Sequence, residues 1–182
     1  GCPVVVKGHS AHPGTSEIVA QAIAAAVDAC DMPKGVFALI QGGHRDVGEA
    51  LVQHPLINAV GFTGSLGGGR ALFDLCAARP TPIPFFGELG SINPVFVLPE
   101  AAKARAADIG TNWAGSLTIG AGQFCTNPGV VFIEESVADT FIASASKALT
   151  AVEEQAMLTD GIAKAYRQGV AQVQQIDNLR EV

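Results

Sequence analysis

The sequence predicts an α/β protein with a mainly parallel sheet and flanking helices. Two observations support this: short apolar runs alternate with stretches of helical periodicity, and glycine or proline clusters separate them. Hydrophobic residues make up 48% of the 182-residue chain and charged residues 15%, against about 25% charged in an average protein. The chain is therefore long and apolar enough to bury a core. We expect part of its charge-poor surface to be covered by other protein segments.

The first strand and helix are predicted close to the start of the sequence. Pro3–Lys7 is a compact apolar strand, and Gly8–Gly14 is a loop. Apolar residues then recur at helical spacing, with Thr15 or Ser16 in place to cap the helix. Pro33-Lys34-Gly35 ends this helix.

The same alternation continues up to Glu88. The elements are a strand at Val36–Ile40, a Gly42-Gly43 turn, a helix over Arg45–Gln53, a strand at Ala59–Phe62, a helix entered through Gly64–Gly69 that ends near Arg79, and a strand at Pro84–Glu88. Repeated units of this kind favour a Rossmann-like parallel sheet over residues 1–88, because parallel strands need crossover connections.

Beyond Glu88 the pattern changes, and we expect a second α/β domain to begin within residues 89–182. Its elements are a strand at Pro94–Leu98, a long helix starting near Pro99, a glycine-rich loop around Cys125, a strand at Val130–Glu134 and two closing helices. The last helix is predicted to carry an apolar face made of Ile162, Tyr166, Val170, Val173 and Ile176.

Charge, composition and histidine spacing argue against a nucleic-acid partner, a membrane span and a metal site. The net charge is −6 and Lys and Arg form no cluster, so no nucleic-acid partner is expected. The uncharged stretch Ile109–Ile133 holds glycines, a proline and amide side chains that lipid would leave unsatisfied. We interpret it as buried protein interior and not as a membrane span. The four histidines lack metal-ligand spacing, so no metal site is expected.

The four cysteines are widely spaced, and no signal peptide is recognised. This favours reduced thiols and a cytoplasmic location. Three of the four, Cys2, Cys30 and Cys76, are interpreted as buried structural cysteines.

Gly61-Phe62-Thr63-Gly64-Ser65 lies where a predicted strand ends and a helix begins. Free backbone amides and the helix dipole favour a phosphate there, and glycines allow it to approach closely. An ordinary tight turn between strand and helix is the alternative.

Lys7 ends the first strand, where its ammonium group can reach a ligand across the carboxyl edge of a parallel sheet. A solvated surface lysine is the alternative. The following residues, Gly8-His9-Ser10, offer no carboxylate to a ribose 2′-hydroxyl. A hydroxyl and an imidazole repel a 2′-phosphate less than an acidic side chain does.

Cys125 and Glu88 are the candidate reactive residues. The glycines and proline of Gly120–Gly129 argue against regular structure around Cys125 and favour the access that a nucleophilic thiol needs; a buried structural cysteine is the alternative. Glu88 ends the apolar run that starts at Ile83, and a carboxylate in such surroundings suits a general base. A strand-end glutamate facing water is the alternative.

In their order along the chain these segments resemble one family, the NAD(P)-dependent aldehyde dehydrogenases. Pro3–Lys7, Gly61–Ser65, Gly87–Gly90 and Gly122–Thr126 look like its cofactor lysine, phosphate turn, base and nucleophile motifs. The separation of Glu88 and Cys125 also suits the family. The resemblance spans nearly the whole chain and implies an incomplete aldehyde dehydrogenase fold, with an NAD(P)-binding part at 1–88 and the start of the catalytic domain at 89–182.

The resemblance implies a role for each matched residue. The cofactor-binding residues would be Lys7 at the adenosine ribose, His9 and Ser10 near its 2′-position, Gly43, Phe62, Thr63, Gly64 and Ser65 around adenine and pyrophosphate, and Leu89 and Gly90 near the nicotinamide. Cys125 would attack the aldehyde to give a thiohemiacetal, which passes hydride to the nicotinamide and becomes a thioester. Glu88 would activate the hydrolytic water.

Within the family, Gly8–Gly14 and Glu88–Pro94 look most like the 2-oxoglutarate semialdehyde (2,5-dioxopentanoate) dehydrogenases, with the fatty aldehyde dehydrogenases of luminous bacteria as near neighbours. NAD-preferring members carry a glutamate where Ser10 stands. Both the resemblance and the electrostatic argument therefore favour NADP, with NAD as the alternative. The expected substrate is a small-molecule aldehyde, oxidised to its acid.

Departures from the family lie at the ends. Family members are more than twice this long, and the oxyanion-hole asparagine, the glutamate that holds the nicotinamide ribose and the oligomerisation strand fall outside the chain. We expect the remaining segments of the same enzyme as partners, and a homo-oligomer for the full-length protein. Two alternatives stay open: a fragment that binds nucleotide or partners without turnover, and a fatty or CoA-acylating aldehyde dehydrogenase.

Overall fold

All strand pairs that the structure describes are parallel, as the alternation of strands and helices predicts. The computed structural model describes residues 1–173, and its strands form three two-stranded sheets. The chain divides into two units, Gly1–Leu89 with the first two sheets and a second unit that begins at Gly90 and holds the third.

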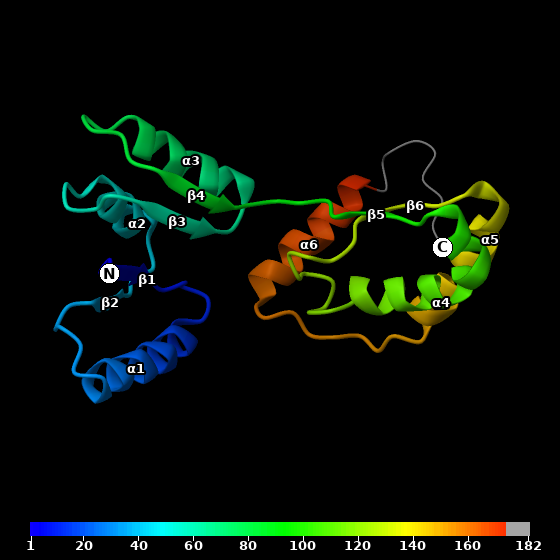
Figure 1. Ribbon diagram of the computed structural model, residues 1–182, viewed down its shortest axis with the longest axis horizontal. Helices are drawn as coiled ribbons and strands as arrows, with labels where there is room; N and C mark the ends of the chain where they lie inside the picture. The colour runs from blue at the N-terminus through cyan, green and yellow to red at the C-terminus, as the bar shows by residue number, and fades with distance from the viewer. Residues whose placement is uncertain (174–182) are drawn as a thin grey trace. The chain divides into compact units, whose positions relative to one another are not determined.

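The first unit consists of two strand–helix–strand segments joined by a helix (Figure 1). Its elements are β1 (Val4–Lys7), α1 (Pro13–Ala29), β2 (Phe37–Ile40), α2 (Arg45–Gln53), β3 (Val60–Thr63), α3 (Leu66–Ala77) and β4 (Phe85–Glu88). β1 pairs with β2 from Val4↔Phe37 to Lys7↔Ile40, and β3 pairs with β4 from Val60↔Phe85 to Thr63↔Glu88. In both sheets the carboxyl ends of the two strands therefore lie at the same edge.

The predicted cap of α1 was wrong. The helix begins at Pro13, and its N-cap residue, His12, makes no side-chain capping hydrogen bond. Thr15 and Ser16 therefore lie inside the first turn. Proline suits the first helical position because its φ angle is already helical and its missing N–H would have had no partner there.

The packed interior of the first unit lies between α2, α3 and the β3–β4 sheet. Val52 and Cys76 are buried, and Arg79 Nη1 donates to the Val52 carbonyl at 2.6 Å, which ties the end of α3 to α2. β1 is less well covered: its three valines, residues 4–6, remain 38–50% exposed. Strands of a complete parallel sheet are usually covered on both faces, so this sheet has an open apolar face within the described residues.

The second unit is built on a pair of packed helices and a short sheet (Figure 1). Its elements are β5 (Pro94–Phe96), α4 (Pro99–Leu117), β6 (Val130–Phe132), α5 (Glu135–Thr150) and α6 (Asp160–Val173). The buried residues between α4 and α5 are mainly small ones, with one aromatic ring: Ala102, Ala106, Ala114, Phe141 and Ala145. Small side chains allow the two helices to approach closely.

Both strands of the third sheet end earlier than predicted. Leu98 and Glu134 were expected to end the strands, but they are the N-cap residues of α4 and α5. Of the apolar face predicted for the last helix, Tyr166 and Val170 are exposed, and Ile176 lies outside the described residues.

The uncharged stretch Ile109–Ile133 covers the end of α4, the Cys125 loop and β6, so it is not a single helix. No helix within residues 1–173 is long and apolar enough to span a bilayer.

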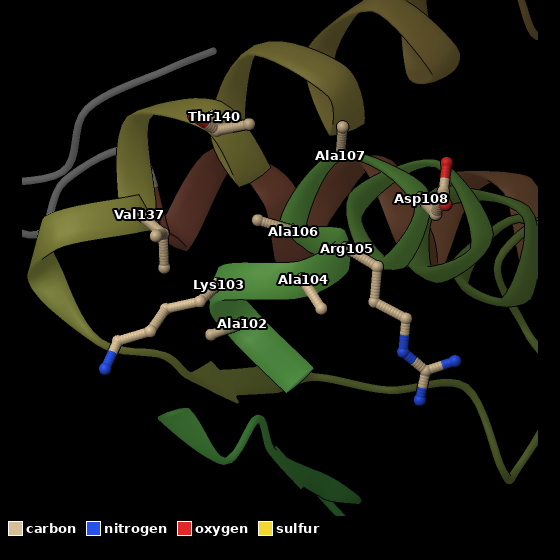
Figure 2. Close-up of a pocket in the computed structure, with 9 residues that line it drawn as sticks. All are labelled: Ala102, Lys103, Ala104, Arg105, Ala106, Ala107, Asp108, Val137 and Thr140. Atoms are coloured by element: carbon tan, nitrogen blue, oxygen red, sulfur yellow. The ribbon is translucent and has the colours of Figure 1, made fainter. Parts of the chain in front are cut away.

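α4 is kinked at Arg105, where φ is −153° and ψ is 34°. A hollow of about 340 Å³ lies at this kink, lined by residues 102–108 together with Val137 and Thr140 of α5. Figure 2 shows the charged ends of Lys103 and Arg105 extending away from Thr140. The hollow contains none of the residues predicted for the active site.

Candidate active site

The parallel pairing of β1 and β2 brings predicted cofactor residues to one sheet edge. Lys7 pairs with Ile40 at that edge, His9 and Ser10 follow β1, and Gly43 follows β2. Lys7 is half-buried, whereas His9, Ser10 and Gly43 are exposed. Open parallel sheets commonly bind ligands outside the carboxyl ends of their strands, and these four residues lie at that edge.

A side chain at Gly8 would require the Gln41 side chain to move. The Gly8 N–H donates to the Ile40 carbonyl at 2.9 Å, and a Cβ built on Gly8 would collide with the Gln41 side chain. Gln41 Nε2 in turn donates to the Pro13 carbonyl at 3.0 Å. Glycine at this position therefore allows the end of β1 to lie close to the start of α1, where the first helical amides have no intrahelical partner.

The loop before α1 presents two stacked imidazoles. The rings of His9 and His12 are 4.9 Å apart at an interplanar angle of 14°. His9 Nδ1 accepts a hydrogen bond from the Ala11 N–H at 3.1 Å, so in the neutral ring the proton is on Nε2. The first turn of α1 holds no acidic residue, which leaves this helix end suited to an anion.

The predicted phosphate turn opens α3 and is hydrogen-bonded to the predicted base strand. Gly64 N–H donates to the Glu88 carbonyl at 3.0 Å. Ser65 is the N-cap residue of α3, and its Oγ accepts from Gly68 N–H at 3.2 Å. The amides of Leu66 and Gly67 have no intrahelical partner, and no acidic residue lies in the first turn. This helix end has the donors and the dipole that a phosphate needs.

Glu88 ends β4 beside Thr63, its register partner, and its side chain is exposed. Neither ion pair found within residues 1–173, Arg70–Asp74 and Lys103–Glu100, involves it. The carboxylate is exposed within the first unit. The next residue, Leu89, packs so closely on α3 that Gly69 has no room for a Cβ.

Cys125 is exposed and lies in a β-turn of the second unit. The Asn127 N–H donates to the Phe124 carbonyl at 3.0 Å, which closes the turn with Cys125 and Thr126 at its centre. Among the described residues the Cys125 N–H donates to no protein acceptor. The loop therefore presents both a thiol and a free backbone donor.

The structural interpretation holds for Cys76 alone and was wrong for Cys2 and Cys30. Burial raises the pKa of the Cys76 thiol, and the charge of Arg79 acts in the opposite direction. Cys2 precedes β1, Cys30 is the C-cap residue of α1, and both are exposed. Helical spacing continues up to Cys30, but the residue lies just past the helix end and is exposed.

Sequence reasoning missed a side chain that holds the Cys125 loop. Asn93 Nδ2 donates to the carbonyls of Cys125 and Asn127, at 2.8 and 2.9 Å. Asn93 lies in the segment Glu88–Pro94 that the resemblance singled out, and asparagine is common in turns, but neither signal points to Cys125. Hydrophobic periodicity does not reveal a contact between loop residues 32 positions apart.

A second asparagine ties the same loop to α4. Asn127 Nδ2 donates to the carbonyls of Leu117 and Ile119, at 2.8 and 3.1 Å, and thereby satisfies carbonyls that the helix end leaves free. Its Oδ1 is buried and has no hydrogen-bond partner within residues 1–173. The loop is thus held from α4 on one side and from Asn93 on the other.

No cluster of three or more metal-ligating side chains exists in the part of the chain that the structure describes. The candidate reactive groups are the Cys125 thiol and the Glu88 carboxylate, both exposed. Glu88 belongs to the first unit and Cys125 to the second.

Comparison with known proteins gives consistent matches. The family model described as the aldehyde dehydrogenase family matches residues 1–176. Alpha-ketoglutaric semialdehyde dehydrogenase 2 of Azospirillum brasilense is 51% identical over 100% of this chain and 35% of its own length. Alpha-ketoglutaric semialdehyde dehydrogenase of Acinetobacter baylyi is 47% identical over 93% of this chain and 32% of its own. The chain thus spans about a third of the length of these curated relatives.

A solved structure supports the same fold. Aldehyde dehydrogenase C of Pseudomonas syringae, a mutant in complex with NAD+ and octanal, is 26% identical to this chain and has a TM-score of 0.73. The match covers 83% of this chain and 29% of that one.

Proposed function

The chain belongs to the aldehyde dehydrogenase family, and from that membership we propose that the full-length protein oxidises a semialdehyde to a carboxylic acid with NADP. The observation that carries this proposal is the 51% identity to a protein named as an alpha-ketoglutaric semialdehyde dehydrogenase. That name supports 2-oxoglutarate semialdehyde as the substrate. Because this chain covers 35% of that relative, the activity is proposed for the whole protein.

Residues 1–88 are proposed to bind the cofactor. The family uses NAD(P), and the amides that open α3, together with Lys7 at the end of β1, fit its phosphates and ribose. Gly43 and Gly67 have no heavy atom within 4 Å of a built Cβ, so a ligand can approach the backbone there. When bound, the nicotinamide supplies the hydride acceptor.

The preference for NADP is supported by the charge of the loop that follows β1. His9 and Ser10 stand beside the start of α1, whose first turn holds no acidic residue. A 2′-phosphate bound there would lie near the positive end of the helix dipole and near donor side chains. No carboxylate of the first turn of α1 would repel it.

Residues 89–182 are proposed to begin the catalytic domain, with Cys125 as its nucleophile. The Cys125 sulfur bonds to the aldehyde carbon, the thiol proton passes to the Glu88 carboxylate, and the Cys125 N–H stabilises the oxyanion. Loss of hydride from this carbon leaves a thioester. Glu88 releases the first proton to solvent and then takes a proton from a water molecule, whose oxygen attacks the thioester carbon. That proton passes to the departing Cys125 sulfur, so that the acid and the thiol are released.

The test is aldehyde-dependent NADPH formation by the full-length protein. The Cys125→Ala variant is expected to lose turnover, because it lacks the sulfur on which the thioester is proposed to form. Cys30→Ala is the matched control, since Cys30 is also an exposed thiol but takes no part in the site. Unchanged turnover in Cys125→Ala would refute the assignment.

We further propose a cytoplasmic location and a homo-oligomer for the full-length protein.

A further inference from the structure

The conformation of the backbone at Cys125 depends on one peptide group. Cys125 and Thr126 are the central residues of the turn that the Asn127 N–H closes on the Phe124 carbonyl. Types I and II of such turns differ in the orientation of the peptide between the two central residues. The oxygen of that peptide is the Cys125 carbonyl. A group that holds this oxygen therefore selects one backbone conformation at the residue that carries the thiol.

Asn93 holds that oxygen and the far end of the turn at the same time. Its Nδ2 donates at 2.8 Å to the Cys125 carbonyl and at 2.9 Å to the Asn127 carbonyl. The amide nitrogen has two hydrogens, so both are used on this turn. If the central peptide rotated, the first bond would break and one amide hydrogen would lose its acceptor.

The Asn93 amide is itself fixed in orientation. Its Oδ1 accepts from Ser91 Oγ at 2.7 Å, which leaves the Nδ2 end directed at the turn. The Asn93 backbone has φ of 47°, a left-handed conformation that asparagine adopts more readily than most other side chains. The Ser91 hydroxyl also accepts from the Asn93 N–H at 3.3 Å.

A second contact docks the same segment on the loop. The Gly129 N–H donates to the Ile92 carbonyl at 2.9 Å, and a Cβ built on Gly129 would stand 2.7 Å from that oxygen. The segment around Asn93 is thus joined to the loop on both sides of Pro128, which is buried. Asn93 reaches the turn from a backbone that is already anchored.

We propose that Asn93 is a positioning residue for Cys125, which fixes the central peptide of its turn and hence the direction in which the thiol and the free N–H are presented. Asn93 acts on Cys125 through a hydrogen bond to its carbonyl oxygen and not through the sulfur. The kinetic consequence of this inference rests on the proposed function. The structural consequence, a turn held by the amide, does not.

Two substitutions of Asn93 distinguish the contribution of its side-chain amide from that of its left-handed backbone conformation. Asn93→Gly keeps the backbone conformation accessible and removes the amide. Asn93→Asp keeps the shape and places carboxylate oxygens opposite two carbonyl oxygens, where no hydrogen is left to donate. Asn112→Asp, at an exposed position of α4, introduces the same charge without touching the loop. Ser91→Ala only frees the orientation of the amide and is milder than either substitution of Asn93.

Two measurements on the full-length protein are needed. In steady-state kinetics, both Asn93 variants are expected to lower kcat about 10- to 100-fold, the cost of misplacing a reacting group. Their Kd for NADP is expected to change less than about twofold, because neither Asn93 nor the Cys125 turn is among the proposed cofactor-binding residues. In hydrogen–deuterium exchange, the Asn127 amide is expected to exchange at least about tenfold faster, with β6 and the Asn112→Asp control unchanged.

The outcomes divide as follows. Folded Asn93 variants with wild-type kcat, or with unchanged exchange at Asn127, would overturn the inference. If both fail to fold, Ser91→Ala decides: a partial loss of kcat with faster Asn127 exchange supports the role, and wild-type values refute it. Absence of aldehyde oxidation in the wild type would refute the proposed function, and the exchange measurement would then decide whether Asn93 holds the turn.

Discussion

Gly110 of α4 lies against the backbone of Phe141 in α5 with no space for a side chain between them. A Cβ built on Gly110 would stand 2.5 Å from the Phe141 carbonyl oxygen, a contact that only a shift of one helix can relieve. This close approach brings together the helices that bury most of the second unit's core.

Gly110→Ala is therefore expected to lower the free energy of unfolding by about 1–3 kcal/mol, as overpacking does. Gly115 is the matched control, because it lies on an exposed part of the same helix with open space at its Cβ. Gly115→Ala is expected to raise the free energy of unfolding by about 0.5–1 kcal/mol through helix propensity alone. Urea denaturation measures both, and equal effects of the two substitutions would contradict the packing argument.

Two substitutions of Ser65 distinguish its role as a helix cap from its proposed role in phosphate binding. Ser65→Ala removes the Oγ that accepts from Gly68 N–H and is expected to lower the free energy of unfolding by about 1 kcal/mol. Ser65→Asp keeps a capping oxygen but adds a negative charge where a pyrophosphate is proposed to bind. It is expected to keep the stability and to weaken NADP binding about tenfold or more. Denaturation and NADP titration distinguish the two effects, and undiminished NADP affinity in Ser65→Asp would argue against a phosphate at this turn.

Ser10 is expected to set the choice between the two dinucleotides. Ser10→Glu places a carboxylate beside the proposed 2′-phosphate and should lower kcat/KM for NADP about tenfold or more through like-charge repulsion. With NAD the same carboxylate can accept from the ribose 2′-hydroxyl, so kcat/KM for NAD should be retained or raised. Ser116→Glu, exposed on α4, controls for the added charge. A parallel loss with both dinucleotides would show that Ser10 does not read the 2′-position.

Cys76 is expected to make stability depend on alkaline pH. Because burial raises the pKa of its thiol, the folded chain holds this proton more tightly than the unfolded chain does. The resulting stabilisation is complete below the unfolded thiol pKa of about 8.5 and is lost as pH rises through the folded pKa. The free energy of unfolding should thus fall more steeply between about pH 7 and about pH 10 in the wild type than in Cys76→Ala. Cys30→Ala should follow the wild-type curve, and identical slopes in all three proteins would disprove the linkage.

Element types could be predicted from the sequence because they depend on local patterns. The helix Arg45–Gln53 was predicted with its observed bounds, and every described strand had been expected within two residues of its place. The ends depend on contacts that periodicity does not encode. The third sheet is an example of such ends. Leu98 and Glu134 follow strand-like sequence, yet each is the N-cap residue of a helix.

The positions of candidate residues at strand ends could be predicted from the sequence. The contacts between residues of different loops could not. Lys7 and Gly43 could be expected at one edge, because parallel strands bring their carboxyl ends together. The contact between Asn93 and Cys125 depends on a left-handed backbone at Asn93 and on a specific turn at Cys125. Neither conformation follows from the residue types alone.

The open valine face of β1 also bears on how the protein is made. During synthesis this strand emerges before much of the sequence that follows it, and an uncovered apolar strand is a template for pairing with other chains. At high concentration the 182-residue chain is therefore expected to self-associate through β1, and light scattering against concentration would reveal it.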